Sequence, residues 1–513
     1  MQKVVNRLQA VLQQQTVWVC LISGALTTLS LAPFDYWPVA IITVALFATA
    51  LQGQSTKKIF LLSWLFGAGF FGSGISWVYV SIHDYGDASV LLATFLTSLF
   101  AIFLGFAFAL PFIIYGKYFV KNILGLTLAF PALWVLGEWT RAWVLTGFPW
   151  LYLGYSHITS PLAGWFPVTG IFGVSFCVVF SAAALANYLL TKKINALIFT
   201  AVLFIAGFGL HQIHWTQVRY DSPIAVGIVQ PNFALADKWN PAKREMIHQT
   251  LELMSQPLWQ QDIILWPEAA LSELYQDALP FLETFDAHGK NTHTTLITGI
   301  PYFDAQATRE TNTPVYYNSI TALGDGSGLY HKVRLVPFGE YVPLEQWLRG
   351  IIRFFDLPMS GFSKGAEHQQ LLTAGAYHVA PLICYEIAYP DLTAHNAQDA
   401  DFLVTVSNDS WFGASIGPLQ HLEMARARAL ETQHFLIRGT NNGVSAIIDS
   451  QGLMQQGSNQ FSQEILTGTI YPVKGKTPFM KWGSIPFVTL LFLILVIIKI
   501  PLHFVLPPLS KGD

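Results

Sequence analysis

The sequence predicts a protein of two parts: a bundle of membrane-spanning helices and an α/β domain of layered sheets and helices. Three observations support this prediction. Over half of the 513 residues are apolar and only 12% are charged, which is too hydrophobic a composition for a soluble protein of this size. The apolar residues gather in long runs over 1–211 and again over 475–513. Between these parts charge returns, and short β-like runs alternate with helical ones.

Apolar runs separated by short polar breaks predict seven transmembrane helices in the N-terminal part and one near the C-terminus. A helix needs about 20 apolar residues to cross a bilayer. The eight predicted spans cover residues 11–31, 37–51, 59–80, 90–115, 123–144, 168–190, 194–210 and 482–498. The second run is short enough to be a tilted or re-entrant segment instead. The first resembles a secretory signal, but no small-residue cleavage site stands out and further spans follow, so we expect it to be retained.

Basic residues predict the orientation, because lysine and arginine favour the cytoplasmic side of a membrane. They precede the first span and then occupy alternate breaks: Lys3, Arg7, Lys57, Lys58, Lys117, Lys121, Lys192 and Lys193. We therefore expect a cytoplasmic N-terminus and, after seven crossings, a central domain on the other side. The predicted domains are a membrane domain over 1–211, a central domain over 212–474, and a last span with its tail over 475–513. Lysines at the outer end of the last span weaken the rule there.

Two features stand out within the predicted spans. The third span carries a cluster of small residues, which predicts close helix packing: Gly67, Gly69, Gly72 and Gly74. The fifth span ends with Glu138, Trp139 and Arg141. Ionisable groups in a membrane are costly and usually functional, whereas aromatic and arginine side chains also serve as interfacial anchors. The sequence leaves both interpretations of the fifth span open.

The central region shows the alternation expected of an α/β layered domain. Short apolar runs predict strands at 224–229, 263–266, 296–299, 316–323, 329–332, 379–383 and 402–406. Apolar residues at helical spacing predict a helix at 241–255, and a second helix is predicted at 418–432, with Glu423, Arg426, Arg428 and Glu431 on it. The glycine-rich segment 324–328 predicts the turn of a hairpin.

One of the three cysteines has a distinctive position. Cys20 and Cys177 fall in apolar runs, which makes a disulfide framework improbable, whereas Cys384 stands where the strand 379–383 meets a turn. A strand end holds the sulfur on rigid backbone. Most free cysteines are inert core residues, and a thiol becomes a good nucleophile only when its neighbours remove its proton.

A carboxylate and an amine also stand at predicted strand ends, namely Glu268 and Lys332. Catalytic groups collect at strand ends in α/β folds. An acid, an amine and the Cys384 thiol are sufficient for acyl transfer through a thioester, because the carboxylate can accept the thiol proton and the ammonium can stabilise an oxyanion. Taken singly, Glu268 and Lys332 are more typical of solvated surface charges. The spacing alone does not bring the three groups together.

Three short motifs carry a resemblance to a known family. They are Trp266-Pro267-Glu268, Lys332 followed by Leu335-Val336-Pro337-Phe338-Gly339-Glu340, and Ile383-Cys384-Tyr385-Glu386. Together they resemble the nitrilase (carbon–nitrogen hydrolase) superfamily, which implies an αββα sandwich with a Glu-Lys-Cys triad. Two further groups resemble the apolipoprotein N-acyltransferase family in particular: Glu138-Trp139 with Gly147-Phe148-Pro149-Trp150, and the stretch Ser407-Asn408-Asp409-Ser410-Trp411-Phe412-Gly413.

The resemblance implies a role for each matching residue. Glu268 would be the general base, Lys332 would stabilise the oxyanion, and Cys384 would be the nucleophile. The remaining matches would support the triad or line and gate a lipid pocket. The supporting residues would be Glu340, Tyr385 and Glu386. The pocket residues would be Trp239, Asn318, Trp411 and Phe412. For the three aromatic residues, ordinary packing is the alternative.

The resemblance also implies substrates and a location. The acyl donor would be a phospholipid, namely phosphatidylethanolamine, and the acceptor would be the α-amino group of a diacylglyceryl-cysteine at a lipoprotein N-terminus. The enzyme would be a monomer of the bacterial inner membrane, with its catalytic domain facing the periplasm. Three alternatives stay open: a membrane-tethered amidohydrolase, in which water replaces the amine, a non-catalytic receptor or scaffold, and a transporter.

Other classes of function find little support. The net charge of −3 gives no indication of nucleic-acid binding. The histidines are scattered without metal-ligand spacing, and no glycine-rich nucleotide loop stands out. We therefore expect no metal and no cofactor.

Overall fold

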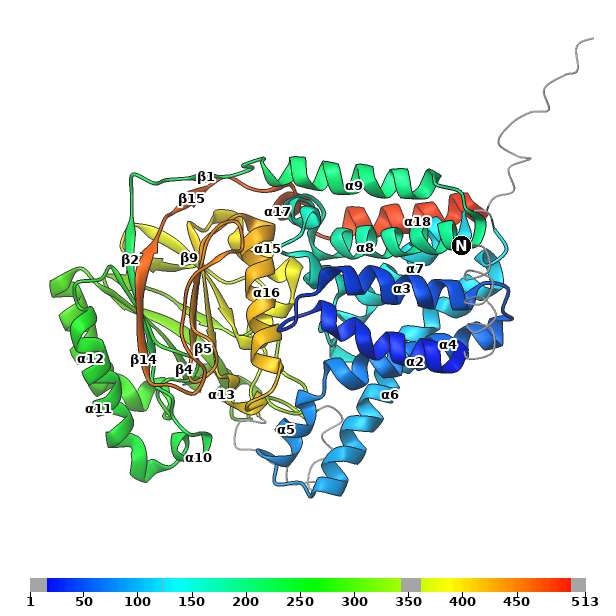
Figure 1. Ribbon diagram of the computed structural model, residues 1–513. Coiled ribbons are helices and arrows are strands. Elements are labelled where there is room, and N and C mark those ends of the chain that lie inside the picture. Colours follow the sequence, from blue (N-terminus) through cyan, green and yellow to red (C-terminus); the bar gives the residue numbers. More distant parts are fainter. Residues whose placement is uncertain (1–15, 123, 343–360, 500–513) are drawn as a thin grey trace, which may run out of the picture. The chain divides into compact units, whose positions relative to one another are not determined.

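The computed structural model describes residues 16–122, 124–342 and 361–499, and the chain divides into two compact units (Figure 1). A helical unit contains residues up to 76, 94–213 and those from 484 onward. An α/β unit contains 77–93 and 214–483. Lys3, Arg7 and the start of the predicted span 11–31 lie outside the described residues.

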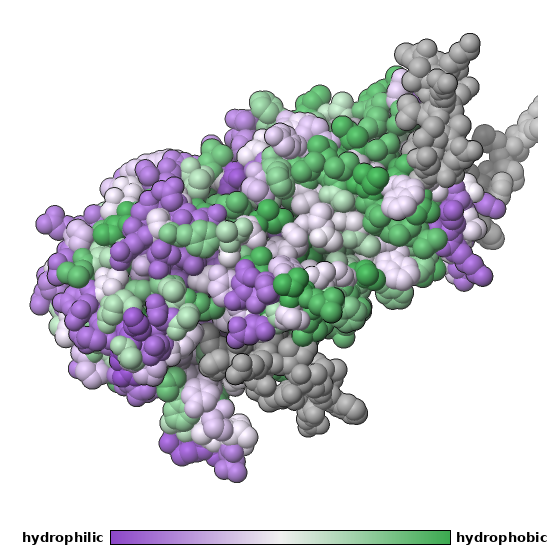
Figure 2. All heavy atoms as spheres, turned by 60° about the horizontal axis from the view of Figure 1, so that its bottom comes forward, coloured by the Kyte–Doolittle hydropathy of each residue, from purple (hydrophilic) through white to green (hydrophobic). Residues whose placement is uncertain are grey.

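The helical unit is built from apolar helices around an aromatic core. The helices are α2 (Thr16–Thr27), α3 (Trp37–Leu51), α4 (Thr56–Gly74), α6 (Val90–Ile114), α7 (Phe130–Arg141), α8 (Phe166–Thr191), α9 (Asn195–His211) and α18 (Ile485–Lys499). In the core, Phe47 stacks on Phe66 with ring centroids 4.3 Å apart, and Phe108 meets Trp134 edge-on at 4.8 Å. Figure 2 shows mainly hydrophobic side chains over the helical unit and many hydrophilic ones over the α/β unit, as expected if lipid surrounds the helices.

Glycines let three of these helices approach closely. A Cβ added to Gly69 would lie 2.1 Å from a backbone oxygen of α2, and one added to Gly67 would lie 2.8 Å from the backbone of α6. One added to Gly74 would lie 2.3 Å from the side chain of Leu151, whereas nothing lies within 4 Å of the corresponding position at Gly72. The predicted close helix packing is therefore confirmed at Gly67 and Gly69, whereas Gly74 packs on a residue outside the helices and nothing lies near Gly72.

The structure supports part of the predicted set of spans. Among the described residues, two helical stretches are long and apolar enough to cross a membrane, Val90–Phe119 and Pro161–Thr191. A third qualifies if α4 and α5 (Trp77–His83) count as one bent span. The other apolar helices fall below this length: Thr16–Ser30, Trp37–Leu51, Asn195–His211 and Ile485–Lys499.

Two predicted spans differ from the observed helices. The predicted span 59–80 is broken, because α4 ends at Gly74 and α5 begins at Trp77; glycine is a weak helix former. The predicted span 123–144 shortens to α7, which follows a π-helical turn. Its Gly125 lies so close to the preceding backbone that an added Cβ would be 1.8 Å from the oxygen of Phe119. Pro131 then favours a helix start, since proline suits the first helical turn.

The α/β unit contains two large mixed sheets and a small two-stranded one. In sheet order, the six-stranded sheet contains β14 (Glu464–Ile470), β2 (Ile224–Gln230), β3 (Ile263–Leu265), β4 (Thr295–Phe303), β5 (Tyr316–Gly324) and β7 (Leu329–His331). The seven-stranded sheet contains β13 (Met454–Gly457), β12 (Ala446–Ile448), β11 (Leu436–Thr440), β10 (Phe402–Ser407), β9 (Tyr377–Ile383), β8 (Leu372–Ala374) and β6 (Gly326–Ser327). The small sheet pairs β1 (Gln217–Val218) with β15 (Val473–Lys474).

Alternation along the strands separates two hydrophobic cores. Ile263 and Leu265 of β3 pack between the sheets with residues of β9, β10 and β11, whereas Ile264 packs on the opposite face of its sheet. That outer face is covered by α11 (Arg244–Ser255) and α12 (Tyr275–Thr292). The alternation follows from the two-residue period of a strand.

Helices also cover the outer face of the seven-stranded sheet, namely α15 (Pro390–Asn396) and α16 (Gly417–Thr432). Figure 1 shows the resulting helix–sheet–sheet–helix layering within this unit. The layered α/β fold expected from the sequence is therefore present. Each predicted strand is observed, with ends within a few residues of those expected.

Candidate active site

A left-handed turn presents Cys384 directly after β9. The residue has a φ of +52° and begins the short helical turn Cys384–Ala388. Non-glycine residues seldom adopt this conformation, and such strain gathers at functional sites. Cys384 is partly exposed, whereas Cys20 and Cys177 are buried. The parallel neighbour β10 ends at Ser407, whose Oγ lies 3.5 Å from the Cys384 Sγ.

Glu268 follows β3 and is nearly fully buried. Its Oε1 accepts a hydrogen bond from Asn318 Nδ2 at 2.7 Å, and its Oε2 accepts one from the backbone N–H of Asn408 at 2.8 Å. Both oxygens of the carboxylate therefore have donors, which satisfies a buried charge and fixes its direction.

Lys332 follows β7 and lies between two carboxylates. Its Nζ is 2.8 Å from Oε1 of Glu340 and 3.5 Å from Oε1 of Glu268. Asn318 Nδ2 also donates to Glu340 Oε1 at 2.7 Å, so this amide bridges the two acids. The second oxygen of Glu340 accepts from the backbone N–H of Val336 at 2.8 Å. We call Glu268, Asn318, Lys332 and Glu340 the acid–base cluster.

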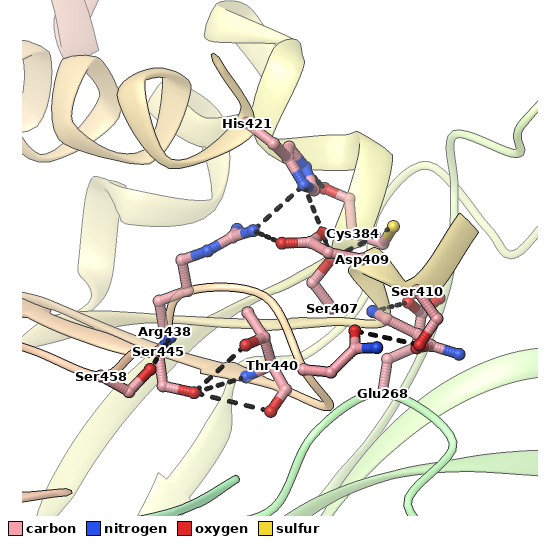
Figure 3. Close-up of polar contacts among 12 residues, drawn as sticks. Glu268, Cys384, Ser407, Asp409, Ser410, His421, Arg438, Thr440, Ser445 and Ser458 are labelled. Atoms are coloured by element: carbon pink, nitrogen blue, oxygen red, sulfur yellow. Dashed lines mark hydrogen bonds and ion pairs between the residues drawn. The ribbon is translucent and has the colours of Figure 1, made fainter. Parts of the chain in front are cut away.

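Two consecutive residues connect this cluster to Cys384. The side chain of Ser407 contacts the sulfur of Cys384, and the backbone N–H of the next residue, Asn408, holds the carboxylate of Glu268. Figure 3 shows Cys384, Ser407 and Glu268 gathered in one region. The acid, the amine and the thiol, which are far apart in sequence, therefore meet at the strand ends of the two sheets.

Charges around the sulfur set its protonation state. Burial and the Glu268 carboxylate raise the pKa of the Cys384 thiol, although the Lys332 ammonium opposes them. Burial also disfavours the Glu268 carboxylate, but Lys332 and the hydrogen-bond donors outweigh it and lower the pKa of that carboxyl. For Lys332, burial is outweighed by Glu340 and Glu268, which raise its pKa. At neutral pH the site therefore holds a thiol, a carboxylate and an ammonium.

Glu386 connects the start of the turn that carries Cys384 to the segment that follows Lys332. Its Oε2 accepts from the backbone N–H of Ile383 at 2.8 Å, and its Oε1 accepts from the N–H groups of Val333 and Arg334 at 2.5 and 3.1 Å. The side chain is fully buried, and burial raises its pKa to about 7 despite these donors. Glu386 thus connects the two strand ends structurally.

The predicted aromatic residues lie in the chain beside residues of the site. Tyr385 is buried and meets Tyr389 edge-on at 5.4 Å. Trp239 is half-buried, directly after the short helix α10 (Leu235–Lys238).

Trp411 and Phe412 are half-buried and contact the segment 77–93, which belongs to the same unit. Trp77 meets Phe412 edge-on at 4.7 Å, and the Ser81 hydroxyl donates to the backbone oxygen of Trp411 at 2.7 Å. Through these contacts the α5 segment supports the stretch that carries Ser407 and Asn408.

Sequence reasoning missed a second buried cation at the site. Lys238 is buried, and its Nζ donates to the backbone oxygen of Glu268 at 2.9 Å. Burial lowers its pKa to about 8, while Glu268 and Cys384 oppose the shift. In the sequence, Lys238 is distinguished by its position directly before Trp239. No motif or spacing used above would have identified it as a residue of the site.

A second buried cluster was also missed, because its members belong to three separate elements. Asp409 follows β10, and its Oδ2 accepts from Nη2 of Arg438 at 2.7 Å. Its Oδ1 lies 3.0 Å from Nδ1 of His421 on α16 and accepts from Ser407 Oγ at 2.7 Å. The other ring nitrogen of His421 lies 3.0 Å from the backbone oxygen of Cys384. We call Ser407, Asp409, His421 and Arg438 the anchor cluster (Figure 3).

This arrangement has the parts needed for acyl transfer. A buried carboxylate and a buried ammonium stand beside a protonated thiol, so the carboxylate can take the proton as the sulfur attacks a carbonyl. The ammonium can stabilise the oxyanion that forms. Among the described residues no group of three or more His, Cys, Asp or Glu side chains has an arrangement that could hold a metal ion.

Two family models match the chain: one covers most of the apolar N-terminal part, and the other covers the α/β part. Residues 23–184 match the N-terminal domain of apolipoprotein N-acyltransferase, and residues 225–474 match carbon–nitrogen hydrolase.

Curated relatives match over nearly the whole chain. An apolipoprotein N-acyltransferase of Pseudomonas syringae is 43% identical, covering 91% of this chain and 93% of the relative. One from Pseudomonas aeruginosa is 44% identical, covering 91% and 92%. One from Coxiella burnetii is 39% identical, covering 93% and 99%.

Solved structures match more distantly. A nitrilase-superfamily protein of Saccharomyces cerevisiae is 17% identical with a TM-score of 0.36, covering 49% of this chain and 90% of that one. A carbon–nitrogen hydrolase of Helicobacter pylori is 15% identical with a TM-score of 0.36, covering 52% and 95%. The family assignment depends on the sequence matches, which are far stronger: this chain belongs to the apolipoprotein N-acyltransferase family, and its α/β unit has the carbon–nitrogen hydrolase fold.

Proposed function

We propose that this protein transfers an acyl chain from a phospholipid to the free α-amino group of the diacylglyceryl-cysteine at a lipoprotein N-terminus. Family membership supports the reaction class. The observation that carries the proposal is the meeting of Cys384 with the acid–base cluster, connected through the adjacent residues Ser407 and Asn408. The nucleophile, the base and the oxyanion-stabilising group are then Cys384, Glu268 and Lys332.

In the first half-reaction the phospholipid acylates the enzyme. The Cys384 sulfur attacks the ester carbonyl while Glu268 takes the thiol proton, because the thiol is neutral and the carboxylate is ionised. Lys332, which Glu340 holds in place, stabilises the tetrahedral oxyanion. The carbon–oxygen bond then breaks, the proton passes from Glu268 to the leaving oxygen, and a lysophospholipid departs from an acyl-thioester.

In the second half-reaction the lipoprotein amine accepts the acyl chain. The α-amino nitrogen attacks the thioester and loses its proton to Glu268. The carbon–sulfur bond breaks, the proton returns to the sulfur of Cys384, and the product is an amide. Two substrates that react in turn with one covalent intermediate give ping-pong kinetics.

The proposal also names the acyl donor, the oligomeric state and the membrane location. The donor is phosphatidylethanolamine, and the protein acts as a monomer in the bacterial inner membrane with its α/β unit facing the periplasm. Eight spans cross the membrane, of which the stretches Val90–Phe119 and Pro161–Thr191 have the required length and hydropathy. A membrane location is physically suitable because both substrates are amphiphiles held in a bilayer.

Mass spectrometry of the purified protein tests the proposal directly. After exposure to phosphatidylethanolamine alone, the wild type is expected to gain one acyl group on Cys384 and to release lysophospholipid. Addition of a diacylglyceryl-cysteine peptide should then discharge the acyl group onto the peptide amine. Cys384→Ala should show neither adduct nor transfer, whereas Cys20→Ala should behave as the wild type.

Three results would contradict the proposal: transfer by Cys384→Ala, absence of lysophospholipid before the acceptor is added, or release of free fatty acid in place of acylated peptide. The last result would instead identify a membrane-tethered hydrolase.

A further inference from the structure

The side chain of Ser407 contacts the proposed nucleophile directly, and the mechanism above does not use it. Its Oγ lies 3.5 Å from the Cys384 Sγ and donates to Asp409 Oδ1 at 2.7 Å. A serine hydroxyl has one proton and two lone pairs, so it cannot donate to both partners at once. While the sulfur keeps its proton, Ser407 donates to the carboxylate and can accept from the thiol.

Asp409 is arranged so that it can release this hydrogen bond. Its Oδ2 accepts from Arg438 Nη2 at 2.7 Å, and its Oδ1 also lies 3.0 Å from His421 Nδ1. Burial disfavours the carboxylate, but Arg438 and His421 outweigh it and hold the pKa of Asp409 well below its ordinary value. The carboxylate therefore stays ionised and keeps two other partners when the hydroxyl turns away.

We propose that Ser407 is a further catalytic residue, whose hydroxyl donates to Asp409 while the Cys384 sulfur is protonated and turns to donate to that sulfur whenever it carries negative charge. This inference rests on the proposed role of Cys384 as nucleophile.

The sulfur carries negative charge twice in each cycle. As the sulfur attacks the phospholipid ester, its proton passes to Glu268 and its electron pair forms the carbon–sulfur bond. When the lipoprotein amine displaces the thioester, the same electron pair returns to the sulfur, which is reprotonated by Glu268. In both steps the Ser407 hydroxyl keeps its own proton and only changes the acceptor. Hydrogen bonds to charged groups are stronger than those to neutral ones, so the contact favours the charged form of the sulfur.

The other charged groups near the sulfur cannot replace this contact. Glu268 and Asp409 disfavour negative charge on it, and Lys332 favours it. Lys238 acts on it from α10 only through space. His421 contacts the backbone oxygen of Cys384, and Arg438 contacts His421 and Asp409.

The test is the alkylation rate of Cys384 by iodoacetamide in the full-length detergent-solubilised protein, read peptide by peptide between pH 7 and pH 10. The rate reports the thiolate and needs neither substrate. Ser407→Ala should lower it about tenfold at each pH, corresponding to a rise of about one unit in the thiol pKa. Thioester formation from phospholipid should fall by a similar factor, and Ser407→Thr, which keeps the hydroxyl, should regain much of both rates.

Ser445→Ala is the matched control. Ser445 is equally buried and hydrogen-bonds to Gln230 and Thr440, so its removal should leave the alkylation of Cys384 unchanged. A rate in Ser407→Ala within twofold of the wild type would overturn the inference. If wild-type protein forms the acyl adduct while Ser407→Ala alkylates normally, only this inference fails; if the wild type forms no adduct, the proposed function fails.

A second variant gives a prediction of opposite sign and decides the question if Ser407→Ala does not fold. Asp409→Asn removes the negative charge that competes for the Ser407 proton and disfavours the thiolate. Alkylation of Cys384 should therefore become faster in this variant. Loss of the Asp409 charge alone also favours the thiolate, so the acceleration should be larger with the Ser407 hydroxyl present than in Asp409→Asn combined with Ser407→Gly. An unchanged or slower rate in Asp409→Asn, or equal acceleration with and without the hydroxyl, would overturn the inference.

Discussion

Two buried clusters of charged side chains reach Cys384, and they differ in how their cation is held. In the acid–base cluster, Lys332 is shared between Glu268 and Glu340, and its distance to Glu268 is the longer by 0.7 Å (3.5 versus 2.8 Å). In the anchor cluster, Arg438 is fully buried in β11 and donates to one carboxylate, Asp409, at 2.7 Å.

This difference indicates that the acid–base cluster serves the reaction, whereas the charge pair of the anchor cluster serves stability. Lysine is a compact charge on a flexible stem, suited to follow a developing oxyanion, whereas arginine is always charged and geometrically fixed. Loss of the acid–base cluster should therefore reduce the rate, and loss of the anchor cluster's charge pair should reduce stability. Substitutions at Glu268, Lys332 and Arg438 test this comparison, and one at Glu386, a buried carboxyl outside both clusters, sharpens it.

The largest effect on rate is expected for Glu268→Gln. The substitution keeps the shape of the side chain but removes the proton acceptor, so thioester formation should fall by about 10²–10⁴-fold. Rapid-quench mass spectrometry of the acyl adduct measures this rate, and an unchanged unfolding midpoint shows that the fold is intact. A wild-type rate in this variant would remove Glu268 from the mechanism.

Lys332→Met should have the next largest effect. Loss of the oxyanion-stabilising charge should slow thioester formation by about 10²–10³-fold. The ammonium also lowers the pKa of Glu268, so the acid limb of the pH–rate profile should move to higher pH in this variant. Lys290→Met, which removes an exposed lysine from a surface ion pair, is the control and should leave the profile where it was. A pH–rate profile that does not move in Lys332→Met would show that Lys332 does not influence the pKa of Glu268 in the reaction.

Arg438→Met should affect stability more than chemistry. It leaves the Asp409 carboxylate buried without its main partner, which costs about 3–5 kcal/mol of unfolding free energy. The double variant Asp409→Asn with Arg438→Met should regain part of this loss, and denaturant titration of the four proteins gives the coupling. Additive losses would show that the pair is not coupled.

The smallest effect concerns Glu386, whose folded-state pKa is raised by burial to about 7 from 4.5. Between these values the folded state binds more protons than the unfolded state, so the unfolding free energy should fall as the pH rises through this window. The fall should amount to about 1–3 kcal/mol. In Glu386→Gln the thermal midpoint should lose this dependence, whereas Asp399→Asn, at an exposed carboxylate, should keep it. A slope that persists in Glu386→Gln would assign it to other groups.

The sequence predicted the parts of the fold that depend on local pattern. The apolar run 263–266, which stops at Pro267, and the helix 418–432 were predicted from local sequence, and both are observed within one residue of their predicted ends. The broken third span and the shortened fifth were not predicted, because hydropathy alone does not report the close packing of Gly74 on the Leu151 side chain or of Gly125 on the backbone of Phe119.

The candidate site, like the fold, was predicted where local sequence was informative and missed where distant elements meet. Cys384, Glu268 and Lys332 stand at the ends of predicted strands, so their placement followed from pattern and family resemblance. His421 and Arg438 gave no signal, and the family-like stretch that contains Asp409 did not indicate its partners, because these contacts depend on how strand order and helix packing bring separate elements together.

The segment 77–93 has a consequence for how the molecule would respond to proteases. It belongs to the α/β unit although the chain before and after it belongs to the helical unit. The backbone therefore passes between the units four times, near residues 76, 93, 213 and 483. Cleavage at both 213 and 483 would still leave residues 214–483 held by α5 through Ser81 and Trp77, so the nicked protein should migrate as one particle until it is denatured.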